Sequence, residues 1–367
     1  MRQAAKWGAF GAAVAMSLAP AQPALAESSL AITGFFKLSY ERIKVSGKPS
    51  TDSEDRVADD RSRITVRAVE ELGGGLQAIG QVDWRLTMDT GADAADGSNY
   101  VGLRSKTWGT LKIGRWELHY KYGRGKIDNE GSFKSRNDSL LAFAGGGDTA
   151  IANASRTPNV IVYDLADLGG FNLEAAYSTD PDTSEADIGS PSRRGYAVNL
   201  RPYYRSRNFE IGYSYWKSRP DAPGAASVDQ RSDRVWAWYK WNSFYIGATW
   251  DHTKFDSSLT GAQTSRRDAW SIPLWYQTGR HGFHLEYSQA QNDKATPGND
   301  GANMWAVAYA YDLSRRTSVA LTYARINNDE AAVYNLWKSA TAPGNADAAV
   351  AAGENPSIVG VTVRHAF

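Results

Sequence analysis

The sequence predicts an all-β fold, a sixteen-stranded antiparallel β-barrel that crosses a membrane. Three observations lead to this prediction. Apolar residues recur at every second position in many short segments, the connections between the segments alternate between short and long, and the 367-residue chain is polar, with a mean hydropathy of −0.48. Period-two alternation is the pattern of strands with one apolar face. A chain this polar excludes a bundle of membrane-spanning helices, each of which needs about 20 consecutive apolar residues.

The first 26 residues have the pattern of a secretory signal peptide. Arg2 and Lys6 give a positive start, an apolar stretch runs over residues 7–19, and Ala24-Leu25-Ala26 matches the small-x-small pattern of a cleavage site. The apolar stretch is shorter than the ~18 residues that a spanning helix needs. We therefore expect a leader at 1–26 and a barrel at 27–367, with a buried N-terminal helix as the alternative.

Sixteen segments carry the strand pattern. They start near residues 30, 61, 76, 99, 109, 157, 171, 194, 208, 231, 243, 267, 281, 302, 317 and 356. The short connections are Gly73–Gly75, Lys106–Gly109, Asp167–Gly170, Arg205–Asn208, Asn242–Ser243, Gly279–Arg280 and Ser314–Arg316, and long polar stretches lie near 46–60, 88–97, 117–153, 180–192, 218–230, 255–266, 292–300 and 328–355. An up-and-down barrel with turns at one rim and loops at the other explains this alternation.

The apolar face of these strands is expected to point outward. Sixteen strands enclose a lumen too wide for side chains to fill, so water enters and the inner face is polar. The outer face then meets lipid, and the sheet must close because lipid cannot hydrogen-bond the backbone of an edge strand. Aromatic residues end many apolar rows, which predicts a girdle at one rim, although strands favour such residues anyway. They are Tyr40, Trp84, Tyr177, Tyr215, Trp250, Tyr276, Tyr287, Tyr311 and Tyr323.

Composition excludes several classes of function. Lys and Arg number 41 against 40 Asp and Glu, so no global basic field suggests a nucleic-acid partner. The chain has no Cys, which excludes disulfides, zinc-thiolate sites, iron–sulfur clusters and cysteine nucleophiles. His281 and His284 lie three apart, and on a strand this spacing places them on opposite faces. We expect no metal and no cofactor.

Four segments in order resemble the Gram-negative general porins, especially the branch common in β-proteobacteria. They are SRITVRAVEELGGGLQA at 62–78, NYVGLRSKTWGTLKIGR at 99–115, SRTPNVIVYDLADLGGF at 155–171, and the alternating end of the chain, which finishes on Phe367. The resemblance covers the whole chain after residue 26. His365 departs from the apolar residue usual near the end, and the Pro-Glu-Phe-Gly pattern of some enteric third loops is absent, which leaves the path of that loop open.

The resemblance implies a homotrimer in the Gram-negative outer membrane. It implies short periplasmic turns, long extracellular loops and a third loop that folds inward and narrows each pore. Phe367 resembles the terminal aromatic that the barrel-assembly machinery reads, and the outer wall would contact outer-membrane lipid and lipopolysaccharide. The implied function is a water-filled channel for passive diffusion of small hydrophilic solutes and ions. For the trimer we expect contacts from strands one to five and sixteen, through Leu30, Ile32, Leu111, Ile113 and Val361, and from the loop at 88–97.

Basic residues are the main candidates for the pore lining. Alternation places Lys37, Arg61, Arg63, Arg67 and Arg85 on the lumen face, together with Glu41 and Asp83. The resemblance adds Arg115 and Arg156. For Arg115 the alternation disagrees, because Leu111 and Ile113 share its face, and we expect a bend to turn it inward. Seven basic residues against two acidic ones predict a modest preference for anions. Ordinary solvation of a wet wall is the alternative interpretation.

The loop at 117–153 is too long for a routine connection. It carries Glu117, Asp128, Glu130, Asp138 and Asp148 against five basic residues, so it has no net charge. If it folds inward, its carboxylates face the arginines across the opening and create a transverse field. If it folds outward, it is a surface loop.

Three alternatives stay open from the sequence. The acidic residues near 46–60 would form a solvated first loop or bind divalent cations that bridge lipopolysaccharide; they are Asp52, Glu54, Asp55, Asp59 and Asp60. An outer-membrane barrel enzyme, of the protease or phospholipase type, would need a catalytic group, and no Ser/His/Asp set stands out among five His. A gated receptor would need a plug domain, and strand one follows the leader directly.

Overall fold

The computed structural model describes residues 28–47, 52–119, 140–141, 156–181, 195–219, 228–336 and 350–367. All the regular elements in these ranges are strands, of which the shortest, β5, has three residues. The expected leader at 1–26 lies outside the described residues. Within the ranges described, no helix is long and apolar enough to cross a membrane.

The chain forms eighteen strands in these ranges. They are β1 (Ser28–Ser46), β2 (Asp52–Asp59), β3 (Arg63–Gly73), β4 (Leu76–Thr87), β5 (Ala92–Ala94), β6 (Asn99–Ser105), β7 (Gly109–Glu117), β8 (Arg156–Asp164), β9 (Phe171–Ser178), β10 (Tyr196–Arg205), β11 (Phe209–Arg219), β12 (Val228–Trp241), β13 (Phe244–Ser257), β14 (Gln263–Thr278), β15 (His281–Ala290), β16 (Ala302–Asp312), β17 (Thr317–Asn328) and β18 (Asn355–Ala366). All pairings between neighbours are antiparallel.

These eighteen strands fill sixteen positions around the barrel. β2 and β3 both pair with the same edge of β1, β2 with its second half and β3 with its first half, so they form one interrupted strand. β5 and β6 share one edge of β4 in the same way. The sixteen-stranded antiparallel architecture is therefore confirmed, and the short connections lie where the sequence predicts them.

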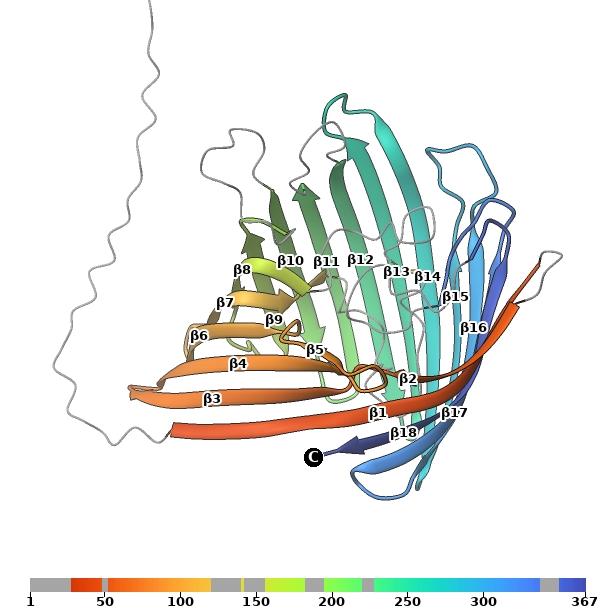
Figure 1. Ribbon diagram of the computed structural model, residues 1–367. Coiled ribbons are helices and arrows are strands. Elements are labelled where there is room, and N and C mark those ends of the chain that lie inside the picture. The colour runs from red at the N-terminus through yellow and green to blue at the C-terminus, as the bar shows by residue number, and fades with distance from the viewer. Residues whose placement is uncertain are drawn as a thin grey trace, which may run out of the picture.

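The barrel closes between its first and last strands. β1 pairs with β18 from Phe35↔Ala366 to Ser46↔Asn355, and Figure 1 shows β18 running beside β1 to the C-terminus. Gly34 and Phe367 extend this seam by exchanging two backbone hydrogen bonds of 3.2 and 3.1 Å. Closure leaves no edge among the described strands, which is the condition for a sheet to span hydrocarbon.

The two faces of the wall are chemically opposite. Apolar side chains point outward and are exposed, among them Leu30, Val101 and Val361, whereas charged side chains such as Lys37 and Arg234 are buried inside. A soluble protein shows the reverse arrangement. The prediction of an apolar outer face and a polar lumen is confirmed.

The structure corrects two details of the loop and rim predictions. The acidic stretch near 46–60 is not a loop, because Asp52–Asp59 pairs with β1 as strand β2. The aromatic residues do not form one girdle either. Tyr276 contacts Phe283 and Phe244 near the short turns, while Tyr287 contacts Trp270 and Trp305 near the long loops. Successive strands run in opposite directions, so aromatic residues at strand ends fall at both rims.

A charge on the outer wall should disrupt the barrel, whereas a polar change on the inner wall should not. Leu285 and Val307 are directly opposed across β15 and β16, and both are exposed. Leu285→Arg or Val307→Arg should reduce the free energy of unfolding by ~2–4 kcal/mol, the cost of Arg near the bilayer midplane. Ala306→Ser, one position away on the inner face, should cost less than about 1 kcal/mol. Urea unfolding in lipid vesicles measures both, and equal tolerance of the two faces would mean that the assigned faces are reversed.

Candidate functional site: the charged lumen

A break in the second barrel strand places a basic segment in the lumen. Arg61, between β2 and β3, has φ of 72°, and the four residues Asp60, Arg61, Ser62 and Arg63 are all buried instead of alternating. The backbone of Lys37 holds this segment through two hydrogen bonds: the Asp60 amide donates to the Lys37 carbonyl at 2.9 Å, and the Lys37 amide donates to Ser62 Oγ at 2.9 Å. The interruption therefore turns consecutive side chains, not alternate ones, toward the lumen.

Three arginines gather around two carboxylates beside this break. Arg85 donates to Asp83 at 2.6 Å, and Arg63 lies 4.0 Å from the same carboxylate. Glu117, at the end of β7, lies 3.5 Å from Arg156 and 3.9 Å from Arg85. Arg63, Arg85 and Arg156 are each nine-tenths or more buried. The cluster thus joins four barrel positions, from β3 to β8.

The cluster carries more positive than negative charge. Lys37 Nζ lies 2.8 Å from Asp60, which the sequence analysis treated as part of a loop. Among the described residues, five cations, Lys37, Arg61, Arg63, Arg85 and Arg156, accompany four carboxylates, Asp59, Asp60, Asp83 and Glu117. One positive charge remains in excess among them. Glu41, counted from the sequence as an opposing acid, is matched by Arg56 at 2.7 Å.

Two predicted residues lie outside this cluster. Arg67 shares the lumen face of β3 but is exposed and donates to Gln81 at 2.7 Å, closer to the short turns. Arg115 shares its face with Leu111 and Ile113, as the alternation indicates, and its electrostatic neighbour is Asp96. β7 keeps its register with β6 through Asn99↔Arg115, but a β-bulge between Gly114 and Trp116 interrupts its pairing with β8 at this residue, so the strand is irregular where the bend is expected.

The described parts of the third loop lie inside the barrel. His119 Nδ1 is 2.9 Å from Ser214 Oγ on β11, and β11 is eight barrel positions from β1, on the far wall. Leu118, Leu140 and Leu141 are completely or almost completely buried and belong to one apolar cluster with residues of many strands. The chain therefore enters the lumen directly after β7. The predicted acidic residues Asp128, Glu130 and Asp138 lie outside the described residues.

The far wall carries buried charges that the sequence analysis did not single out. Arg201 donates to Glu174 at 3.1 Å, and Arg234 donates to Asp251 at 2.9 Å. Arg267 donates to the hydroxyl of Tyr334, which shows that the segment after β17 also folds inward. Alternation already put Arg201, Glu174 and Asp251 on the polar face, so the signal was present. The contact of Tyr334 joins residues 67 positions apart and has no local signal.

The lumen offers no metal centre in the ranges described, since no three His, Asp or Glu side chains there could hold one ion. His281 and His284 lie on opposite faces: His281 is exposed beside Tyr309, and His284 is buried beside Glu286. The arrangement of charges can orient and attract small ions without binding a cofactor.

Comparison with known proteins identifies relatives along nearly the whole chain. A family model described as Gram-negative porin matches residues 11–331. An outer membrane porin protein of Bordetella pertussis is 26% identical and covers 81% of this chain and 88% of its own, and outer membrane porin protein 32 of Delftia acidovorans is 24% identical over 95% and 97%. The solved anion-selective porin from Comamonas acidovorans superposes with a TM-score of 0.77 at 22% identity, over 93% of this chain and 100% of that one.

The contact of His119 predicts a pH-dependent stability. Burial lowers the pKa of His119 to about 3, so the unfolded chain takes up this proton first as the pH falls below ~6.5. The stability that neutral His119 contributes is therefore nearly complete at pH 7 and decreases toward pH 3, by roughly 2.5 kcal/mol at pH 4.5. His119→Asn cannot titrate, so the difference in urea midpoint between wild type and variant should narrow between pH 7 and 4.5. A difference that stays constant with pH would contradict the assignment.

Proposed function

We propose that this chain, which belongs to the Gram-negative porin family, forms an outer-membrane channel that passes small hydrophilic anions more readily than cations. The passive channel follows from family membership together with the closed barrel and its polar lumen. The preference for anions rests on the excess of positive charge in the cluster around Asp83 and Glu117. We further propose that residues 1–26 are a cleaved leader and that Phe367 signals assembly.

Buried charges beside the third loop should determine the preference of the pore for anions over cations. Surface charges separated from the pore by more than ~8–10 Å are screened at physiological salt, whereas charges held in the wall of the lumen act on a passing ion at close range. The net charge of the whole chain, +1, is therefore a poor guide to selectivity. The anion selectivity named for the Comamonas acidovorans porin supports the same direction.

Reversal potentials across a potassium chloride gradient test the proposal. Arg63→Gln should lower the ratio of anion to cation permeability, because it removes one of the five cations of the cluster. Arg115→Gln is the matched control and should change the ratio little, since the electrostatic neighbour of Arg115 is Asp96 and not a member of the cluster. The preference should also shrink in 1 M salt, where the screening length is ~3 Å. A cation-selective wild type would refute the proposal, and a larger effect of Arg115→Gln would assign control to the Gly114-Arg115 motif.

We also propose a homotrimer that buries the outer face of β1, β6, β7 and β18. Several of the most exposed apolar side chains lie there, including Leu30 at 69%, Val101 at 66% and Ile32 at 60%. The expected loop over a neighbour is shorter than 88–97, because β5 pairs with β4 of its own barrel and Gly97 donates to the Asp83 carbonyl at 3.1 Å. Only the turn at 88–91 is left to reach a second subunit.

Mass measurement by light scattering in mild detergent tests the trimer. Wild type should have three times the monomer mass and convert to monomer on boiling. Val101→Asn with Ile113→Asn, a directly opposed pair on β6 and β7, should yield monomers. Leu285→Asn with Val307→Asn, the equivalent pair on the other wall, should leave the mass unchanged. A monomeric wild type would refute the trimer.

The alternative of a barrel enzyme now has one feature to consider, because His119 lies between Ser214 and Asp251. The His119 Nε2 atom is 4.0 Å from Asp251, beyond hydrogen-bond distance, and Asp251 is already bonded to Arg234 and Ser232. Ser214 also accepts from Asn199 at 2.9 Å, and all three residues are buried. A histidine with a pKa of about 3 is a poor general base at neutral pH. The contact therefore favours an anchor for the third loop over a catalytic triad.

A further inference from the structure

A row of basic residues crosses the outer wall on four neighbouring strands. Lys217 of β11 lies opposite Arg231 of β12, Arg231 lies opposite Lys254 of β13, and Lys254 lies opposite Arg266 of β14. All four occupy outward positions of their strands. At a strand spacing of ~4.8 Å the row spans roughly 14 Å. Like charges directly opposite each other destabilise a sheet, so three such pairs in succession indicate an external counter-charge.

Carboxylates near the row neutralise it only in part. Arg231 lies 2.9 Å from Asp233, and Lys254 lies 2.8 Å from Asp256. Asp229 pairs with Arg219, and Asp268 pairs with His252 and Lys294. Among the described residues, Lys217 and Arg266 have no carboxylate within ion-pair distance. The positive charges of Lys217 and Arg266, at the two ends of the row, are therefore not neutralised by a carboxylate of this chain.

The row lies at the height of lipid headgroups. Phe244 belongs to the aromatic girdle near the short turns, and Lys254 follows ten residues later on the same strand. Ten residues extend ~33 Å along a strand, which a tilt of 35–45° reduces to about 25 Å across the membrane. The apolar band of such barrels is about 25 Å tall. The cations thus stand just beyond the hydrocarbon, at the rim of the long loops.

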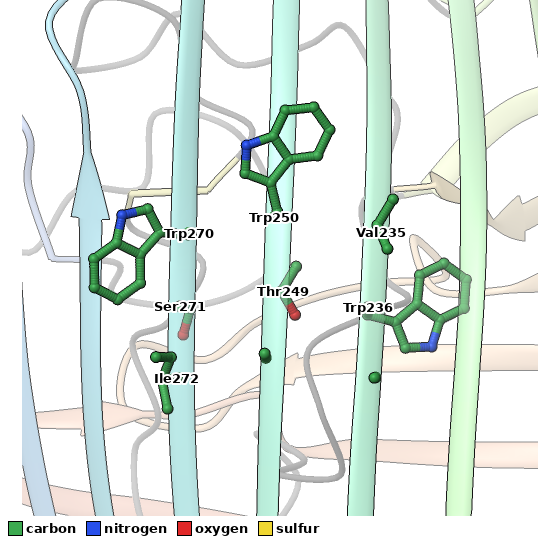
Figure 2. Close-up of a pocket in the computed structure, with 9 residues that line it drawn as sticks. Val235, Trp236, Thr249, Trp250, Trp270, Ser271 and Ile272 are labelled. Carbon is green, nitrogen blue, oxygen red and sulfur yellow. The ribbon is translucent and has the colours of Figure 1, made fainter.

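An apolar groove lies below the row on the same strands. It has a volume of about 280 Å³, and Figure 2 shows Trp250 and Trp270 on neighbouring strands beside Val235 and Ile272. Ala237 and Ala248, directly opposed on β12 and β13, leave the groove between these larger side chains. Trp250 is four residues from Lys254, so about 13 Å separates groove and row along the strand.

We propose that Lys217, Arg231, Lys254 and Arg266 bind the phosphates of an anionic outer-leaflet lipid, one acyl chain of which lies in the groove beside Trp250 and Trp270. The width of the row fits a headgroup with two phosphates better than one with a single phosphate. The site lies on β11–β14, away from the wall proposed for the trimer. The lipid proposal rests on the proposed outer-membrane location of the barrel, and it does not depend on the ion selectivity of the pore.

Native mass spectrometry of the full refolded protein in detergent tests the site, with bisphosphorylated lipid A, monophosphorylated lipid A and phosphatidylcholine as probes. Wild type should retain them in that order. Lys217→Gln with Arg266→Gln removes two cations that hold no carboxylate, and should lower retention of the bisphosphorylated lipid about tenfold or more. Ala248→Phe, which fills the groove, should lower retention without a change of charge.

The matched control is Arg280→Gln with Arg315→Gln, two exposed cations at the opposite rim, in the short turns after β14 and β16. It should leave lipid retention unchanged. Equal retention by the two double variants would overturn the proposal and leave the row as a network of its own ion pairs. Displacement of the lipid by millimolar inorganic phosphate would overturn it in favour of a site for free anions. Reversal potentials should stay at the wild-type value in all these variants. The test of lipid binding is therefore separate from the test of ion selectivity, and failure of one proposal can be told from failure of the other.

Discussion

Closure of the sheet is the constraint on which the other features depend. The wall is one strand thick, and the backbone groups of every strand must find partners within the sheet because lipid supplies none. The seam between β1 and β18, extended by the paired backbones of Gly34 and Phe367, removes the last edge. A wall of this kind has no interior of its own. Each residue therefore faces either lipid or the lumen. Because successive side chains of a strand point to opposite faces, apolar and polar residues alternate in the sequence.

The interrupted second strand converts this regular wall into a charged site. A continuous strand would send every other side chain of residues 60–63 into lipid, where charged groups are costly. The left-handed turn at Arg61 instead buries all four inside, next to Lys37 and Asp83. Buried charges need partners: Asp60 is paired with one cation, and Asp83 and Glu117 are each shared by two. Sharing leaves net positive charge facing the lumen.

The sequence was sufficient for the architecture because barrel strands carry their pattern locally. The predicted starts agree with the strands within a few residues, except where Asp52–Asp59 resembled a loop through its acidic composition. Alternation predicted the lumen residues of the regular strands, such as Lys37 and Arg85, but it did not predict the consecutive buried residues at 60–63 or the β-bulge at Arg115. Contacts between distant segments were not predictable. The Asp60 partner of Lys37, the Ser214 partner of His119 and the Tyr334 partner of Arg267 depend on how loops fold into the lumen, and no periodicity encodes that.

The two halves of the barrel differ in the chemistry of both their inner and their outer surfaces. On the inside, the wall of β1 to β8 carries the basic cluster, while β11 and β13 receive the first residues of the third loop through Ser214 and Asp251. On the outside, the first half presents plain aliphatic side chains such as Leu30 and Val101, and β11–β14 present tryptophans, tyrosines and paired charges. Aliphatic surface suits contact with a second copy of itself, whereas amphipathic and charged surface suits the lipid interface. The same half of the barrel therefore differs on both faces. The half around β1 to β8 carries the basic cluster inside and the proposed subunit contact outside, whereas the half around β11 to β14 anchors the third loop inside and contacts the membrane outside.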